Sequence, residues 1–171
     1  MNEIKEQKFT KTYGDYTFEL RGYKKVMGHD DSLPFNASLY INNKKVAACY
    51  NDGWGGEAVV QVNEKYRGLY DRAIEALKQH EPDTWYQRIN NLVDMLACKM
   101  EDEKFRIKFI KRHMGSLIFA NEEKIFAVPL RTNNGKLVCV QEAITHAQGK
   151  RTVDAIVEKY EKQGYEHIKT Y

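Results

Sequence analysis

Residues 35–57, FNASLYINNKKVAACYNDGWGGE, predict a β-hairpin followed by a polar glycine loop, and the fold expected for the chain is built around them. Asparagine is the non-glycine residue that best tolerates the positive φ of a tight two-residue turn, so we place Asn42 and Asn43 at the turn. Apolar residues of the two strands then meet on one face, which defines a register. That register pairs Ile41 with Lys44, Leu39 with Val46, Ala37 with Ala48 and Phe35 with Tyr50.

The composition is that of one soluble domain. The chain has 171 residues, 42% of them hydrophobic and 30% charged, and its 3 prolines and 11 glycines leave little room for a flexible linker. We expect a single domain over residues 1–171, with disorder confined to a short N-terminal segment, residues 1–10. Apolar runs are only a few residues long and the N-terminus lacks the apolar stretch of a signal peptide, so we expect a cytoplasmic protein without a membrane partner.

Neither charge nor cysteine content indicates a special class of protein. The net charge of +3 permits contact with nucleic acid without requiring it, since dedicated binders concentrate more charge on one face. Cys49, Cys98 and Cys139 are odd in number, far apart and without Cys-x-x-Cys spacing, which indicates neither a disulfide framework nor a zinc ribbon. We interpret all three as small buried hydrophobic residues.

Strand patterns come first along the chain and helical patterns follow. Residues 17–26 read as a strand that borders the hairpin, and residues 58–62 predict a further strand. Apolar residues then recur at helical spacing over residues 66–77, after Asn63 as a candidate N-cap.

A second helix is predicted from an apolar stripe over residues 85–100, where Thr84 and Gln87 have the spacing of a capping box. Residues 101–114 fit both a strand and a continuation of this helix. We favour the helix, with its end near Gly115.

The last third of the chain predicts a second hairpin, a further turn and strand, and a C-terminal helix. These are the hairpin 117–120 and 125–128 with Phe119 facing Phe126, the strand 137–140 after Asn134-Gly135, and the helix 152–162 before Gly164. Segregated strands and helices argue for an α+β domain with antiparallel sheets built from hairpins, two central helices and a C-terminal helix, rather than a parallel sheet.

The glycine loop is the predicted binding surface. Its glycines expose backbone N–H groups, and Trp54 offers a flat apolar anchor of the kind enriched at binding hot spots. The alternative is a structural turn in which Trp54 folds back over the sheet and Asp52 bonds its own backbone. The predicted site comprises Asn51, Asp52, Gly53, Trp54, Gly55, Gly56 and Glu57, with Tyr40 on the solvent face of its strand opposite Lys45.

A basic segment after the second apolar stripe is the alternative surface, for nucleic acid. As a helix it forms a basic stripe able to meet phosphates or an acidic protein surface. The opposing interpretation is a helix whose Phe105 and Phe109 pack inward while its lysines pair with Glu101 and Glu103. None of the usual nucleic-acid-binding motifs is present. The basic residues are Lys104, Arg106, Lys108, Lys111 and Arg112.

Catalytic and metal signatures are weak. No Gly-x-Ser-x-Gly or cysteine-protease signature occurs, although a triad assembled from distant residues stays open. His29 stands beside Asp30 and Asp31, but adjacent residues point apart, so we interpret this segment as a solvated loop. We predict no cofactor, no metal and no catalytic residue. A small-ligand enzyme using Asp30, Asp31, Asp52 and Glu57 is the third hypothesis.

Residues 35–57 resemble a pattern found in small uncharacterised proteins of phages, plasmids and conjugative elements. In that pattern a strand ending in Leu-Tyr meets a tight turn, then Lys-Lys-Val, then Asn-Asp-Gly-x-Gly-Gly. Here the matching residues are Leu39-Tyr40, Asn42-Asn43, Lys44-Lys45-Val46 and Asn51-Asp52-Gly53-Trp54-Gly55-Gly56. Asn43 departs from the more usual glycine. The resemblance implies a genomic setting and a small adaptor or antagonist of a host protein, and it transfers no catalytic residues.

The leading hypothesis is therefore a bacterial, mobile-element-associated protein that binds a host macromolecule, with a protein as the expected partner and no chemistry of its own. Nucleic-acid binding through the basic helix is the alternative, and an unrecognised small-ligand enzyme is the third reading.

Overall fold

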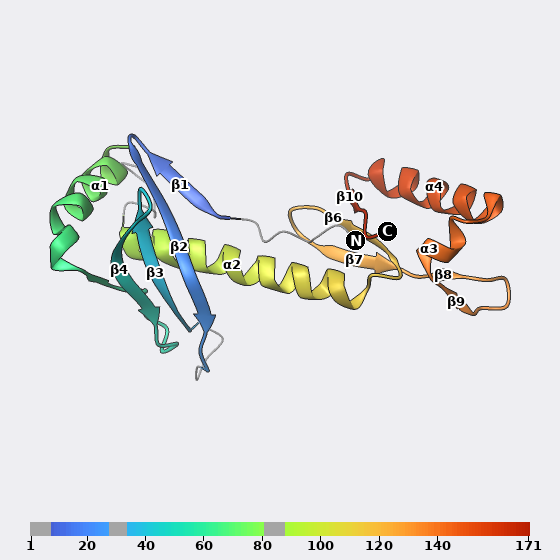
Figure 1. Cartoon of the computed structure of the whole chain (residues 1–171), viewed down its shortest axis with the longest axis horizontal. Coiled ribbons are helices and arrows are strands. Elements are labelled where there is room, and N and C mark those ends of the chain that lie inside the picture. The colour runs from blue at the N-terminus through green and yellow to red at the C-terminus, as the bar shows by residue number, and fades with distance from the viewer. Residues whose placement is uncertain (1–7, 28–33, 81–87) are drawn as a thin grey trace. The chain divides into compact units, whose positions relative to one another are not determined.

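The computed structural model describes residues 8–27, 34–80 and 88–171, which form two compact units (Figure 1). Of the described residues, those up to Glu103 form one unit, and residues 104–171 form the other. Each has its own sheet and its own hydrophobic core. The expectation of a single domain stays a prediction. The predicted capping box, the acidic loop at 29–31 and most of the predicted disordered segment lie outside the described residues.

The first unit is built on a five-stranded antiparallel sheet with the strand order β1-β2-β3-β4-β5. Its strands are β1 (Thr10–Tyr13), β2 (Tyr16–Lys25), β3 (Phe35–Ile41), β4 (Lys44–Asn51) and β5 (Val59–Val62). The last four match the predicted strands to within a residue or two. β1 has no predicted counterpart, because Thr10-Lys11-Thr12 carries no apolar alternation, and its first residue falls inside the segment expected to be disordered.

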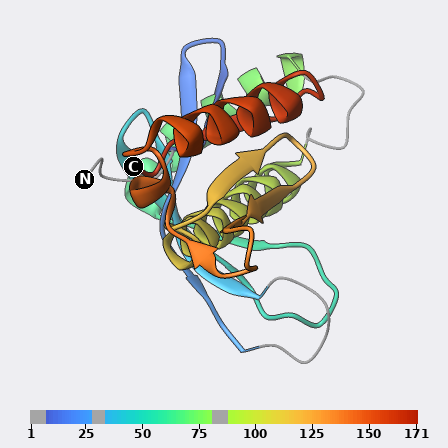
Figure 2. The same cartoon turned by 90° about the vertical axis from the view of Figure 1, so that its right-hand side faces the viewer.

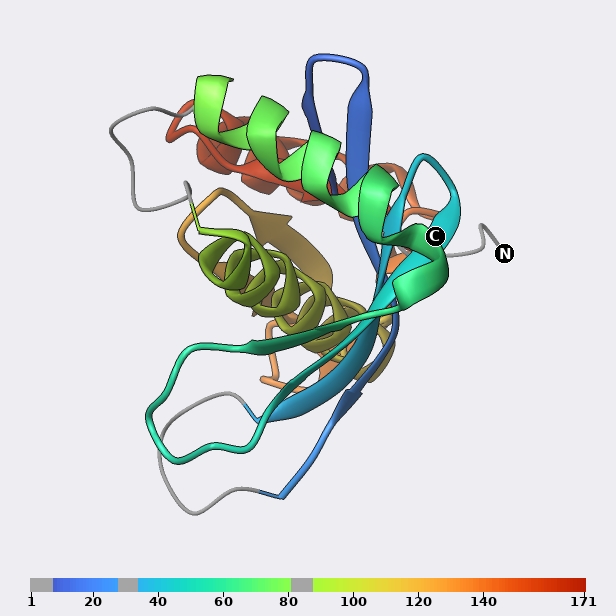
Figure 3. The same cartoon turned by 90° about the vertical axis from the view of Figure 1, so that its left-hand side faces the viewer.

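Two helices follow the strands. A 3-10 turn, η1 (Glu64–Tyr66), leads into α1 (Arg67–His80), and the Asn63 side chain accepts the N–H of Lys65 (3.0 Å), which confirms the predicted N-cap. α2 (Ile89–Arg112) begins in this unit and continues to Arg112, which confirms the helical interpretation of the segment after residue 100. Figure 3 shows α1 and the first part of α2 on the same side of the sheet.

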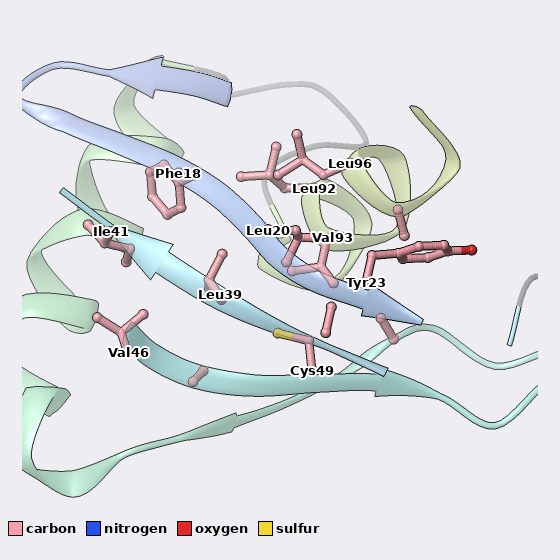
Figure 4. Packing of buried hydrophobic residues seen from close by; sticks show 14 of the residues in the cluster. Phe18, Leu20, Tyr23, Leu39, Ile41, Val46, Cys49, Leu92, Val93 and Leu96 are labelled. Carbon is pink, nitrogen blue, oxygen red and sulfur yellow. The ribbon is translucent and has the colours of Figure 1, made fainter. Parts of the chain in front are cut away.

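The core of the first unit lies between the sheet and these helices. Side chains on the inward face of the sheet are buried, and the apolar stripe of α2 packs against them, as predicted. Figure 4 shows this cluster, which includes Phe18, Leu20, Leu39, Ile41, Val46, Cys49, Leu92, Val93 and Leu96.

The turn of the hairpin is confirmed. Asn42 and Asn43 have φ of +48° and +65°, as a tight turn of this type requires. The Asn42 side chain also joins the neighbouring turn, because its Oδ1 accepts the N–H of Thr17 (2.8 Å) and its Nδ2 donates to the carbonyl of Asp15 (2.9 Å).

The hairpin register is correct next to the turn and wrong beyond it. A bulge shifts the pairing by one residue, so that Leu39 faces Ala47 rather than Val46. Val46 and Ala47 are both buried, and the inward row then continues through Cys49 and Asn51. The extra residue lets two consecutive apolar side chains face the core, at the cost of one ladder position. The structure therefore overturns three predicted pairs: Leu39–Val46, Ala37–Ala48 and Phe35–Tyr50.

The second unit contains a three-stranded antiparallel sheet of order β10-β6-β7, a two-stranded ribbon and two helices. The elements are β6 (Leu117–Ala120), β7 (Ile125–Val128), β8 (Leu130–Arg131), β9 (Leu137–Val138), α3 (Val140–Ala143), α4 (Ala147–Glu161) and β10 (Glu166–Ile168). Figure 2 shows α4 alongside the sheet, where Val153 of α4 joins Leu117 and Phe119 of β6 in one buried cluster.

Most predictions for the second unit are confirmed. β6 and β7 form the hairpin with Phe119 opposite Phe126, and Gly164 follows α4 with φ +84°. α4 begins at Ala147, earlier than predicted, and the predicted strand 137–140 is shorter because Val140 begins α3. β10 has no predicted counterpart, because three residues are too few to show the alternation of apolar and polar residues that indicates a strand.

The interpretation of all three cysteines as buried is wrong for two of them. Cys49 is buried, whereas Cys98 and Cys139 are exposed. Desolvation raises the pKa of the Cys49 thiol to about 12.

None of the helices within the described ranges combines the length and the apolar character needed to span a lipid bilayer.

Candidate functional site

Asn51 closes the base of the glycine loop. It is the last residue of β4 and is buried. Its Oδ1 accepts the N–H of Gly53 (2.9 Å), while its Nδ2 donates to the carbonyl of Gly56 (3.0 Å). One side chain thus joins the two sides of the loop, which fixes where the chain leaves β4 and where it returns.

Asp94, on α2, attaches this base to the helix. Its Oδ2 accepts the N–H of Ala58 (3.0 Å), and its Oδ1 lies 3.5 Å from Nδ2 of Asn51. Burial raises the pKa of the Asp94 carboxyl, and the hydrogen bonds from Ala58 and Asn51 partly oppose that rise. A partly desolvated carboxylate therefore binds both ends of the loop through hydrogen bonds.

Glu57 makes the second attachment to the start of α2. Its carboxylate forms an ion pair with Arg88 (3.2 Å) and accepts a hydrogen bond from Nδ2 of Asn90 (3.3 Å). Arg88 and Asn90 are exposed or half-buried, so each contact is weak by itself. Together with Asp94 they hold the end of the loop at two points of the same helix.

The tip of the loop presents an indole to solvent. Gly53 and Gly55 have φ of +82° and +80°, conformations that favour glycine, and Oδ1 of Asp52 accepts the N–H of Trp54 (3.1 Å). The local bond predicted for Asp52 is thus present. The Trp54 side chain is 68% exposed, so the alternative in which it folds back over the sheet is wrong.

Tyr40 does not join this loop. It lies near the turn end of β3, opposite Lys45, with the guanidinium carbon of Arg21 4.3 Å from the centre of its ring. Asn51 stands at the other end of β4, six residues from Lys45, which at about 3.3 Å per residue is a separation of about 20 Å. The structure therefore brings the seven loop residues together and leaves Tyr40 apart.

The basic segment forms part of α2 in the second unit. Phe105 is 61% exposed, and ring contacts run along the helix from Phe105 to Phe109 (6.3 Å) and from Phe109 to His113 (4.4 Å). The expectation that both aromatics pack inward is thus wrong for Phe105. The five basic residues are Lys104, Lys108, Lys111 and Arg112, which are exposed, and Arg106, which is half-buried.

The acidic partners expected for these lysines lie on the first-unit part of α2. Glu101 accepts hydrogen bonds from Tyr23 (3.1 Å) and Lys25 (3.1 Å), and Glu103 is buried. Residues 104–171 contain 13 basic and 7 acidic residues, a net charge of +6, whereas residues 7–103 contain 13 basic and 15 acidic residues, a net charge of −2. The charge of the chain is therefore unevenly divided between the units.

The residues named for a small-ligand enzyme are only partly described. Asp52 is exposed and Glu57 is paired with Arg88, while Asp30 and Asp31 lie outside the described ranges. Within residues 8–27, 34–80 and 88–171, no three His, Cys, Asp or Glu side chains gather as a metal site would require.

Asp94 is the site residue that sequence reasoning missed. It interrupts the apolar run Leu92-Val93-Asp94-Met95-Leu96, and Leu92, Val93 and Leu96 are buried. A carboxylate inside such a run needs hydrogen-bond donors, so the pattern itself marks Asp94 as the acceptor of a buried contact.

Comparison with protein-family models, curated proteins and solved structures finds no match to this chain. The resemblance of residues 35–57 to proteins of mobile elements stays a prediction.

Proposed function

We propose that this chain is a binding protein without chemistry of its own, and that the glycine loop, residues 51–57, is the surface that captures a protein partner. The observation that carries the proposal is an indole 68% exposed on a loop whose base is fixed by Asn51, Asp94 and Glu57.

A fixed loop suits this role for a physical reason. Association is opposed by the entropy lost when loops and side chains become ordered, and a loop already ordered in the free protein avoids part of that loss. Tryptophan adds a large apolar area with few rotatable bonds, which is why it dominates many interfaces. The resemblance of residues 35–57 supports a bacterial host protein as the partner.

The test is affinity capture of the tagged full chain from nuclease-treated lysate of its native host, followed by mass spectrometry. We expect a partner held by the wild type and by Phe105→Ala, and lost with Trp54→Ala. Phe105 is the matched control, because it is an exposed aromatic residue of the other unit.

Circular dichroism and thermal unfolding accompany the capture. Loss of folded structure in Trp54→Ala would show that the indole supports the fold, and the site assignment would then be wrong. Retention of the same partner by a folded Trp54→Ala protein would also overturn it.

Nucleic-acid binding by the second unit is the second candidate, favoured by the net charge of +6 over residues 104–171. It predicts binding to duplex or single strands with an affinity that falls steeply as salt rises, because bound lysines release counterions from phosphate. Lys108→Glu should weaken that binding, whereas Lys45→Glu, in the first unit, should not. Salt-insensitive or undetectable binding would eliminate this candidate.

A further inference from the structure

β5 (Val59–Val62) forms one edge of the five-stranded sheet. The N–H of Asn63 donates to the carbonyl of Val46 (2.8 Å), so these two residues form a hydrogen-bonded pair. Hydrogen-bonded and non-hydrogen-bonded pairs alternate along an antiparallel ladder. Gln61 and Val59 therefore bond to β4, while the backbone groups of Val60 and Val62 point away from it.

The outward backbone groups of Val60 and Val62 have no hydrogen bond to any described residue. Ala58 lies on the same side of the strand, but its N–H is already bound to Asp94. The part of the edge whose outward backbone groups have no such bond thus begins after Ala58, the residue that follows the glycine loop in sequence.

β5 is short, with four residues, but it lacks the sequence features that usually protect a sheet edge. Its sequence, Val-Val-Gln-Val, has no charged residue, no proline and no bulge, and Val59 is 41% exposed. The opposite edge of the same sheet, β1, carries Lys11 in the middle of its four residues. The two edges therefore differ, and β5 is the one suited to accept another strand.

We infer that the partner of the glycine loop supplies an extended segment that adds to the β5 edge, with its backbone bonded to Val60 and Val62. The inference rests on the proposed function and names the chemistry of the partner. Alternating apolar residues suit the uncharged edge and the indole of Trp54. A flanking lysine or arginine suits the exposed Asp52 carboxylate and the net charge of −2 over residues 7–103.

The experiment uses a displayed library of random linear peptides, selected against the full chain. Hydrogen exchange of individual backbone amides is then followed by NMR with and without a selected peptide. We expect exchange at Val60 and Val62 to slow about fivefold or more when the peptide is bound, because each amide gains a hydrogen bond. Val59 and Gln61 are internal controls, since their N–H groups already bond to β4.

A variant gives a second readout. Proline is tolerated in an edge strand where its N–H would face out of the sheet, so Val60→Pro should retain the β4–β5 ladder and lose peptide binding. The exchange measurement on the unmodified chain decides the question if this variant fails to fold.

The outcomes separate this inference from the proposed function. Peptides that bind through Trp54 without protecting Val60 and Val62 would overturn the edge inference and leave the loop proposal standing. Peptides that protect these amides equally in Trp54→Ala would support the edge and overturn the loop. Protection that rises with protein concentration alone would make a second copy the occupant, and this result, like the absence of any selected peptide, would overturn the inference.

Discussion

Asp94 accepts the backbone N–H of Ala58 at 3.0 Å, and this contact joins the N-terminal part of α2 to the residue that precedes β5. The contact orders two features at once. It fixes the end of the glycine loop, and it occupies the one outward N–H that would otherwise extend the open edge of β5.

Replacing Asp94 tests whether the carboxylate holds the loop. Asp94→Ala should lower the free energy of unfolding by about 1–3 kcal/mol, because the N–H of Ala58 loses its acceptor in a partly buried place. Asp94→Asn keeps one acceptor oxygen and should stay within about 1 kcal/mol of the wild type at neutral pH. Urea unfolding measures both. Equal losses in the two variants would show that the charge, rather than the hydrogen bond, is what matters.

The fold class follows from local chemistry that is visible in the sequence. Asn42 and Asn43 mark a turn that only a few residues tolerate, and Phe119 faces Phe126 because the hairpin around residues 122–123 leaves one consistent pairing. The register beyond Leu39 does not follow in this way. Two consecutive apolar residues on β4 permit either a regular ladder or a bulge, and tertiary burial decides between them.

The sequence predicts where the candidate site lies along the chain, but it does not predict the contacts that hold the loop in place. The three glycines and the tryptophan identify the loop, whereas the contacts that hold its end come from Arg88 and Asp94, each more than thirty residues away in sequence from its partner. In the sequence, only the carboxylate of Asp94 within an apolar run indicates that such a contact exists.

Thiol reactivity should separate the three cysteines. In the native chain at pH 8, Cys98 and Cys139 should react with a thiol reagent, and Cys49 should react only after denaturation, because it is buried and its thiol pKa is raised to about 12. Burial also raises the pKa of Cys98, so it should react more slowly than a fully solvated thiol. Mass spectrometry of the labelled peptides identifies each site. Rapid native labelling of Cys49 would contradict its placement in the core.

Replacing each of the two asparagines of the hairpin turn by glycine should have different effects on stability. Asn42→Gly loses the hydrogen bonds to Thr17 and Asp15 and should destabilise the chain by about 1–2 kcal/mol. Asn43→Gly relieves a positive φ of +65° and should be neutral or stabilising by up to about 1 kcal/mol. Thermal unfolding compares them. A larger loss for Asn43→Gly than for Asn42→Gly would show that its exposed contact with Arg21 outweighs the backbone effect.

Gly149 should not tolerate a side chain. A Cβ at this position would lie 2.1 Å from the carbonyl oxygen of Ala143, so Gly149→Ala must force α3 and α4 apart and should cost about 1–3 kcal/mol or more. Gly68→Ala is the matched control. Gly68 lies in α1, and a Cβ at this position would have its nearest neighbour 3.6 Å away, at the flexible end of the Arg72 side chain. That change should stabilise the helix by up to about 1 kcal/mol. Similar effects of both substitutions would contradict the close approach of the two helices.

His167 should make the stability of the second unit sensitive to acid. Its ring lies beside Phe119 (5.3 Å between ring centres) and Tyr171 (5.9 Å), and its buried Nε2 has no hydrogen-bond partner in the described chain. Burial, with the nearby charge of Lys169, lowers the pKa of His167 below its ordinary value of 6.5, and Glu161 partly opposes this shift. The protonated ring is thus less favourable in the folded than in the unfolded chain, so its contribution to stability is present above the unfolded pKa and is lost as pH falls through the folded pKa.

His167→Phe removes this titration and keeps the ring contacts. Between pH 8 and pH 5 the free energy of unfolding should therefore fall less in His167→Phe than in the wild type. His167→Gln should also flatten the pH dependence, at a lower stability throughout, because it loses the aromatic packing. Denaturant unfolding at several pH values gives the slopes, and an unchanged slope in both variants would show that other groups cause the acid sensitivity.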